Sequence, residues 1–144
     1  MRCLRWLLIV AGLAGACAPK TVPVPVVSAS RFPDFVTPEV PASLAGTRAV
    51  EHHDRGWRFL QAGDLDNAEH EFAAALQAVP AFYPAETSLG YVELARKEPK
   101  NALAYFDRAL DQQKGDVSAL IGRGQTLVAL GREADALAAF EAEM

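Results

Sequence analysis

The chain has 144 residues, 22% of them charged, and a formal net charge of −4 at pH 7, which is enough for one modest domain. Acidic and basic residues are interspersed from Arg48 to Glu143 without a run of one sign, and this excludes the basic patch of a nucleic-acid binder. Both cysteines, Cys3 and Cys17, precede residue 18, so disulfides, thiolate zinc sites and cysteine nucleophiles are excluded from residues 18–144.

Residues 1–16 have the order of a signal peptide. Arg2 and Arg5 precede an apolar run from Trp6 to Leu13, and the small residues 14–16 follow. The apolar run is far shorter than the roughly 20 residues that a membrane-spanning helix needs. We therefore predict a cleaved leader and no transmembrane anchor at this end.

The segment Leu13-Ala14-Gly15-Ala16-Cys17 resembles the lipobox of bacterial lipoproteins. The resemblance implies that Cys17 carries lipid and becomes the mature N-terminus, although Ala14 stands where the family prefers Leu. The alternative is an ordinary A-x-A cleavage site that releases a soluble protein. Cys17 favours the lipoprotein, because secretion would otherwise leave one unpaired, exposed thiol.

Residues 17–46 are predicted to be a lipidated cysteine followed by a disordered, proline-rich linker. Six of the nine prolines lie in it, and that spacing excludes a helix. Val and Pro alternate at 22–26, which favours extended polyproline II and a spacer that holds a domain away from a lipid surface. The alternative is that Arg31–Phe35 docks on a partner or on the rest of the chain, because Phe32 and Phe35 form an apolar pair.

A shift of 34 residues superimposes the rest of the chain on itself. It aligns three sets of residues, which are Gly56, Gly90 and Gly124, then Ala68, Ala102 and Ala136, then Phe72, Phe106 and Phe140. Each copy predicts two amphipathic helices. The first helices are expected at about 48–62, 84–96 and 117–130, and the second at about 65–78, 99–112 and 133 onward. Gly63-Asp64, Pro99 and Gly115-Asp116 mark helix ends.

These aligned residues also predict how the two helices of a copy pack. The glycines leave room for the second helix, the alanines there present only a methyl group, and the phenylalanines fill the wider space. Period and residues together resemble the tetratricopeptide repeat, whose pattern runs Trp-x-x-Leu-Gly-x-x-Tyr, then Ala-x-x-x-Phe, then Pro. His52, Glu86 and Leu120 depart from it at the tryptophan position.

The resemblance implies an all-α solenoid of helical hairpins, wound as a right-handed superhelix. Residues 47–144 would hold three units, 49–82, 83–116 and an incomplete 117–144. An array normally ends in a polar capping helix. Because the third unit shows none, we expect either a longer array or self-association through this uncapped C-terminal repeat.

The family uses a concave groove formed by the first helices to bind a peptide or a helix of a partner. One face of these helices predicts the groove residues His53, Trp57, Gln61, Thr87, Tyr91, Ile121 and Gln125. Trp57 and Tyr91 would anchor an apolar or mixed peptide. The alternative is that both rings pack against the neighbouring repeat or the proline-rich segment.

No pattern in the sequence predicts a catalytic, metal or cofactor site. The histidines do not converge as metal ligands would, and neither a nucleophile elbow nor a phosphate loop is present. We predict a non-catalytic scaffold that binds a protein or peptide partner. Its N-terminal lipid is expected to anchor it to the outer membrane, on the side that faces the periplasm. The alternatives are the docking part of a larger envelope enzyme and a soluble periplasmic adaptor.

Overall fold

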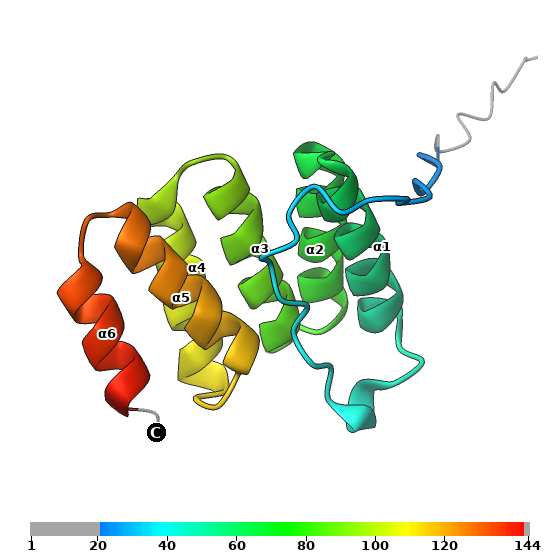
Figure 1. Ribbon diagram of the computed structural model, residues 1–144. Coiled ribbons are helices and arrows are strands. Elements are labelled where there is room, and N and C mark those ends of the chain that lie inside the picture. Colours follow the sequence, from blue (N-terminus) through cyan, green and yellow to red (C-terminus); the bar gives the residue numbers. More distant parts are fainter. Residues whose placement is uncertain (1–20, 143–144) are drawn as a thin grey trace, which may run out of the picture.

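The computed structural model describes residues 21–142, so the predicted signal peptide and Cys17 lie outside the described residues. Within this range the regular elements are helices, and no strand occurs (Figure 1). A short 3-10 helix, η1 (Ala42–Leu44), precedes α1 (Arg48–Ala62), α2 (Leu65–Ala78), α3 (Tyr83–Ala95), α4 (Pro99–Gln112), α5 (Val117–Ala129) and α6 (Glu133–Ala142). The predicted all-α class is confirmed, and the predicted helix bounds agree within about one residue at most ends.

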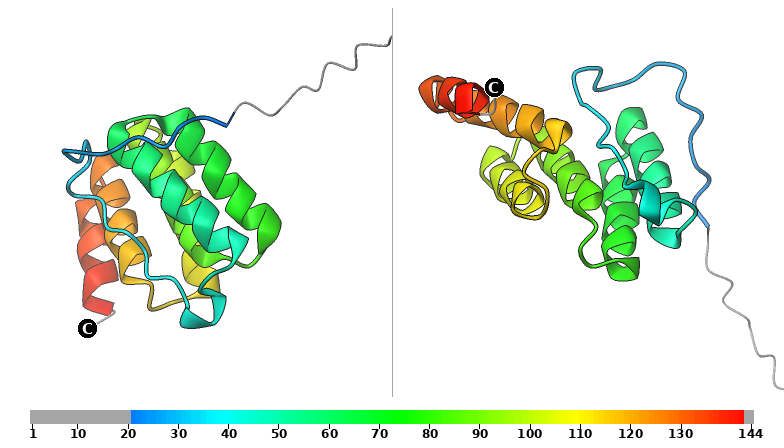
Figure 2. Two further views of the ribbon diagram at one scale, coloured as in Figure 1. Left: turned by 90° about the vertical axis from the view of Figure 1, so that its right-hand side faces the viewer. Right: turned by 90° about the horizontal axis from the view of Figure 1, so that it is seen from below.

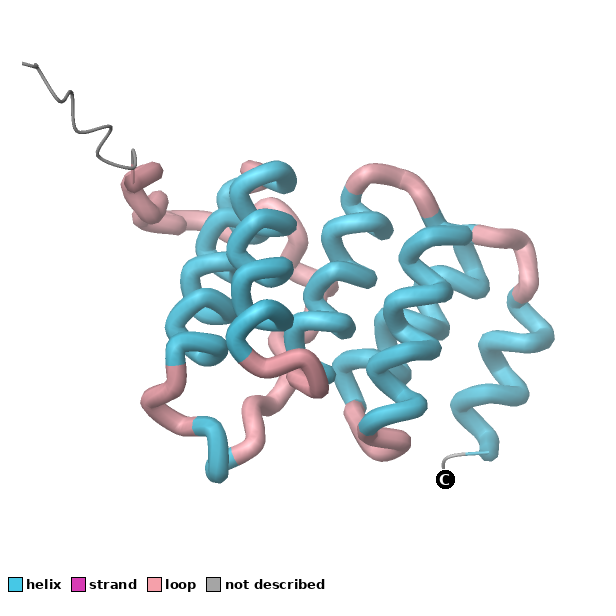
Figure 3. The backbone as a smooth tube through the Cα atoms, turned by 180° about the vertical axis from the view of Figure 1, so that it is seen from behind, coloured by secondary structure: helices cyan, strands magenta, loops and turns pink. Residues whose placement is uncertain are grey.

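The helices form three hairpins that stack side by side (Figure 3). α1 packs on α2, α3 on α4 and α5 on α6, while α2 contacts α3 and α4 contacts α5. The first helices also contact one another, α1 with α3 and α3 with α5. This is the order of a helical-hairpin solenoid, in which each unit buries its apolar side against its neighbours.

Local chemistry sets the helix boundaries. The Asp64 side chain caps α2 by accepting a hydrogen bond from the Asn67 N–H at 3.3 Å, and Asp116 caps α5 in the same way. Pro99 occupies the first turn of α4, where its missing N–H costs nothing. Gly63 ends α1 with a left-handed φ of 82°, a conformation that glycine adopts without strain.

The aligned glycines face phenylalanine rings, which corrects the predicted packing. A Cβ atom at Gly56 would lie 2.5 Å from the Phe72 ring, and one at Gly90 would lie 2.7 Å from the Phe106 ring. The glycine therefore makes room for the aromatic ring, rather than for the alanine methyl group of the second helix. Phe106 is enclosed on both sides, because Gly122 of the next hairpin also touches its ring.

The remaining packing residues are buried as predicted, with one exception. Ala68, Ala102 and Ala136 lie in the core together with the two enclosed phenylalanine rings. Phe140 contacts Gly124 but is 43% exposed, since no further hairpin covers α6 within the described residues. Exposed Val128 and Leu137 lie in the same last hairpin.

The proline-rich segment is not the predicted disordered spacer. Residues 30–39, here called the strap, run across α1, α3 and α5 and contact all three helices (Figures 1 and 2). The prolines exclude a helix, as expected, but an extended chain can still dock when a neighbouring surface supplies hydrogen-bond partners. The alternative prediction, docking of Arg31–Phe35 on the repeats, describes these residues correctly.

Candidate protein-binding face

The first helices of the three hairpins form one surface, here called the first-helix face, and the strap lies on it. Four hydrogen bonds join main-chain atoms of the strap to the three helices, one to α1, one to α3 and two to α5. They are Arg31 N–H to Gln61 O at 2.9 Å, Gln125 Nε2 to Asp34 O at 3.0 Å, the Ser118 hydroxyl to Val36 O, and the Tyr83 hydroxyl to Glu39 O at 3.1 Å. The face therefore holds an extended chain largely through its backbone.

Aromatic contacts join the strap to the core. The rings of Phe32 and Phe35 stack with their centroids 4.8 Å apart, and Phe35 lies 4.7 Å from Tyr91. Tyr91 in turn meets Trp57 at 5.9 Å and Phe106 at 5.1 Å. Such edge and offset contacts stabilise aromatic clusters beyond simple burial, so the strap extends the hydrophobic core outward.

The structure brings three of the predicted groove residues, Gln61, Tyr91 and Gln125, into contact with the strap. His53, Trp57, Thr87 and Tyr91 are buried, whereas the remaining three, Gln61, Ile121 and Gln125, are half-buried. The prediction of exposed anchoring rings is therefore corrected. Both rings pack against neighbouring repeats and the strap segment, and the Tyr91 hydroxyl donates a hydrogen bond to Ser118 O at 2.9 Å.

The buried His53 joins α1 to α3 through Ser88. Its Nε2 lies 3.0 Å from Ser88 Oγ, which also accepts a hydrogen bond from Trp57 Nε1 at 3.0 Å. The Ser88 hydroxyl donates to Pro84 O at 2.7 Å. Trp57 Nε1 also donates toward His53 Nε2 at 3.2 Å, and because the Ser88 proton points to a carbonyl, the pair is not arranged as a base and a nucleophile.

Burial also keeps this histidine neutral. It lowers the pKa of His53 from 6.5 to about 4, because a charged imidazole loses its hydration in the core. Sequence reasoning did not find the pairing with Ser88. The 34-residue counterparts of Ser88 are Asp54 and Gly122, so the repeat pattern gives no sign of a polar contact at this position.

A second polar group fixes the start of α5 beside the strap. Asp116 accepts hydrogen bonds from the Thr87 hydroxyl at 2.6 Å and from Ser118 N–H at 3.1 Å. Burial raises the pKa of Asp116, and the hydrogen bond from Thr87 opposes this shift. The cap orients the first turn of α5, where the Ser118 hydroxyl meets the strap carbonyl of Val36.

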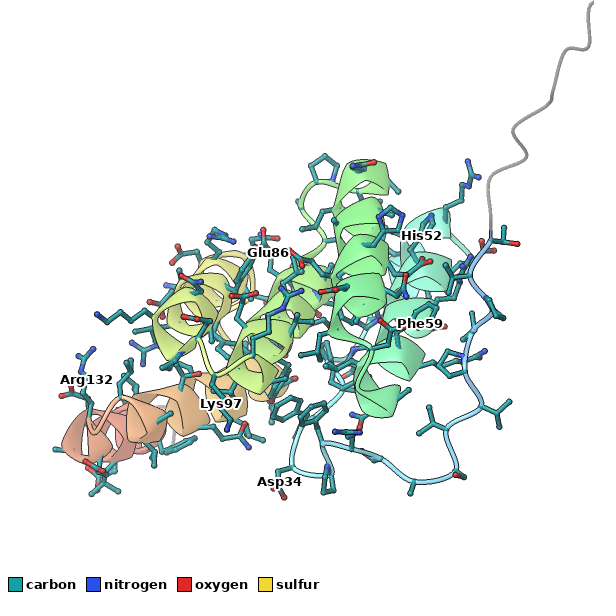
Figure 4. All side chains as sticks on the ribbon, turned by 90° about the horizontal axis from the view of Figure 1, so that it is seen from above. Asp34, His52, Phe59, Glu86, Lys97 and Arg132 are labelled. Carbon is teal, nitrogen blue, oxygen red and sulfur yellow. The ribbon has the colours of Figure 1, made fainter. Side chains whose placement is uncertain are left out.

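The surface opposite the strap has a different chemistry. Figure 4 shows Asp34 where the strap turns, and Glu86 on the other side of the molecule. Glu86 pairs with Arg108 at 3.2 Å, and Arg96 pairs with Glu69 at 2.7 Å. Exposed ion pairs of this kind remain hydrated and contribute little binding energy, so an extended apolar segment fits the first-helix face better.

The described residues contain neither a cluster of metal-ligating side chains nor a helix that could cross a membrane. Among residues 21–142, no group of three or more His, Cys, Asp or Glu side chains is placed to hold a metal ion. None of the helices in that range has the length and apolar composition that crossing a bilayer requires.

Comparison with known proteins adds one finding. A family model described as tetratricopeptide repeat matches residues 53–117 and again 89–143, which together cover more than half of the chain. The two matches overlap in the middle hairpin, as expected when a model made of more than one repeat is laid on a three-hairpin array. No curated protein matches the sequence.

Proposed function

Because the chain belongs to the tetratricopeptide repeat family, we propose that it is a non-catalytic interaction scaffold whose first-helix face receives an extended segment of a partner protein. One observation supports this assignment above the others. The face already holds a segment of chain outside the helices, with one turn at residues 32–35, and it does so through hydrogen bonds between all three first helices and main-chain atoms of that segment. A surface that binds a backbone in this way can accept another extended segment.

The face has the composition of a binding surface. Aromatic rings lie at its centre, where Trp57 and Tyr91 support Phe35, and polar side chains such as Gln61 and Gln125 lie at its sides. An apolar centre with a polar rim is typical of protein interfaces. A partner would therefore compete with the strap for this surface.

Site-specific photo-crosslinking in the living cell tests the proposal. A photoreactive residue replaces Gln125 on the first-helix face, and the matched control replaces Arg108, which is half-exposed on the opposite surface. We expect adducts heavier than the chain at position 125, with one partner protein identified by mass spectrometry, and far fewer at position 108. Equal adducts at both positions, or adducts at position 108 alone, would contradict a partner on the first-helix face.

We propose further that the scaffold is anchored by lipid in the cell envelope, on the outer membrane facing the periplasm, within an assembly or secretion complex. The support is the order of charge, apolar run and Cys17 at residues 1–17. Intact mass of the chain recovered from membranes, compared with Cys17→Ser, tests it. A chain that begins at Cys17 and carries acyl mass is expected. An unmodified soluble chain would contradict the anchor and favour a soluble periplasmic adaptor.

A further inference from the structure

The strap presents its side chains to the repeats with a period of three. Within residues 30–39, Phe32 and Phe35 are half-buried and Pro38 is buried, while the other strap residues are exposed. The Phe35 N–H donates to Phe32 O at 3.2 Å, so residues 32–35 form a β-turn that brings the two rings together, and Pro38 follows three residues later. The three strap side chains that are turned away from solvent are therefore spaced as Phe-x-x-Phe-x-x-Pro.

Apart from the Ser30 hydroxyl, which donates to Gln61 Oε1, and the Arg31 side chain, which lies against Gly63, the remaining recognition goes through the backbone of the strap. The hydrogen bonds at residues 31, 34, 36 and 39 go to main-chain N–H or carbonyl groups. Another segment with a turn at the same place offers the same groups, except where proline removes the N–H at the position of Arg31. Sequence preference on this face therefore comes mainly from the two aromatic positions and the proline, which are the least exposed side chains of the strap.

We infer that the first-helix face binds protein segments with the pattern aromatic-x-x-aromatic-x-x-Pro, and that the strap is the chain's own competing copy of this ligand. The inference rests on the proposed function and specifies the chemistry of the partner. The strap matches that chemistry in the structure, since Phe35 packs on Tyr91 with its ring tilted by 32° and Phe32 stacks on Phe35.

Competition from the strap follows from its covalent attachment. The strap is joined to α1 through residues 40–47, and a short tether gives a tethered ligand an effective concentration of about millimolar. A free segment with the same contacts must therefore displace the strap, which already occupies the first-helix face. Weakening the strap without altering the first-helix face should raise the affinity for a free segment.

A peptide-binding experiment on the full chain tests this. The probe is a fluorescein-labelled peptide of residues 28–41, and its control carries Phe32→Ala and Phe35→Ala. The chain is used as wild type and with Phe32→Ser and Phe35→Ser in the strap. We expect the strap variant to bind the probe at least about ten-fold more tightly than wild type, and the control peptide at least about ten-fold more weakly than the probe.

Two matched variants keep the test decisive. Arg31→Pro weakens the strap by removing the N–H that donates to Gln61 O, together with a side chain that lies against Gly63, and should also raise the affinity for the probe. Arg108→Ala, on the opposite surface, should bind the probe as wild type does. Circular dichroism shows whether each variant keeps its helices. If the chain with Phe32→Ser and Phe35→Ser is unfolded, the affinity of Arg31→Pro for the probe tests the inference instead.

The outcomes separate this inference from the proposed function. Equal affinity of the folded strap variants and wild type for the probe, or equal affinity for probe and control peptide, would overturn the inference. If a partner still crosslinks at position 125, the proposed function stands while this partner chemistry is wrong. Peptide binding as expected, with no partner adduct at position 125, would support the face's preference and contradict the proposed function in the cell.

Discussion

Gly90 carries a hydrogen atom where other residues carry a Cβ atom, and the packing of its repeat depends on this difference. A Cβ atom there would lie 2.7 Å from the Phe106 ring, which cannot move away because Gly122 touches it from the next hairpin. Overpacking of this kind costs about 1–3 kcal/mol, and the better helix propensity of alanine returns about 1 kcal/mol at most. The repeat thus depends on glycine at this position, even though glycine weakens the helix itself.

We therefore predict that Gly90→Ala lowers the free energy of unfolding by about 1–2 kcal/mol, measured by urea denaturation. Gly115→Ala is the matched control, since no atom lies within 4 Å of the added methyl group. The control should change the free energy by less than about 0.5 kcal/mol. Equal effects of the two substitutions would show that Phe106 can yield to the added methyl group.

His53 makes stability depend on pH. Its pKa is about 4 in the folded chain and 6.5 in the unfolded chain, so the unfolded chain binds more protons below pH 6.5 and folding weakens as the pH falls. The contribution of neutral His53 to the free energy of unfolding is fully present above pH 6.5 and is lost progressively as the pH falls toward 4. At 1.36 kcal/mol for each pKa unit, the loss reaches about 3 kcal/mol at pH 4.

The comparison that isolates this effect is wild type against His53→Gln, unfolded by urea at several pH values. Other titrating groups affect both chains equally, so the difference between the two free energies reports His53 alone. We predict that wild type loses about 3 kcal/mol more than the variant between pH 7.5 and pH 4. Parallel pH profiles would contradict a neutral, buried imidazole.

At the scale of the helix, the C-terminal end of α3 departs from its counterparts. α1, α3 and α5 all end with a hydrogen bond that closes a six-residue turn, such as Glu98 N–H to Glu93 O at 2.9 Å. Gly63 and Gly131 supply the left-handed residue in two of these turns, but Lys97 supplies it in α3 with a φ of 62°. The left-handed conformation costs a non-glycine residue roughly 1–2 kcal/mol.

Lys97→Gly should therefore raise the free energy of unfolding by about 1 kcal/mol, seen as a higher urea midpoint. The labelled Lys97 in Figure 4 lies in the turn between α3 and α4, and its side chain is exposed, so the substitution removes little packing. The reverse change, Gly131→Ala, should cost about the same, because no atom opposes its methyl group and only the backbone is strained. A Lys97→Gly chain less stable than wild type would refute this account of the helix end.

The helices could be predicted from the sequence because their causes are local. The 34-residue period, the apolar stripes and ends such as Asp64 and Pro99 each act within a few residues. The strap could not be predicted with the same ease, because prolines show which hydrogen-bonded elements are excluded and not where an extended chain docks. The pair Phe32 and Phe35 was its one signal, and the same docking brings Phe35 onto Tyr91.

On the scale of the whole molecule, the last hairpin carries an uncovered apolar surface. Val128, Leu137 and Phe140 are 53%, 61% and 43% exposed, whereas Phe72 and Phe106, the counterparts of Phe140, are fully buried. A neighbouring hairpin would cover such a surface in a longer array. Self-association through this end stays a prediction.

Sedimentation velocity at several concentrations checks that prediction. We expect wild type to associate as its concentration rises, and Leu137→Glu to remain monomeric, because a charge on this exposed side chain opposes burial in an interface. Glu141→Gln is the control on the same helix, at an exposed position. Identical sedimentation of wild type and Leu137→Glu at every concentration would argue against self-association through α6.

The molecule as a whole is an array whose first-helix face is covered by its own residues 30–39, and amide hydrogen exchange tests this central claim most directly. In the intact chain, we predict that the Arg31 amide, which donates to Gln61 O, exchanges many-fold more slowly than the free peptide of residues 28–41. Phe32→Ser with Phe35→Ser should abolish that protection while the helices remain protected. An Arg31 amide that exchanges in the wild-type chain as fast as in the free peptide would contradict the docked strap and the competition built on it.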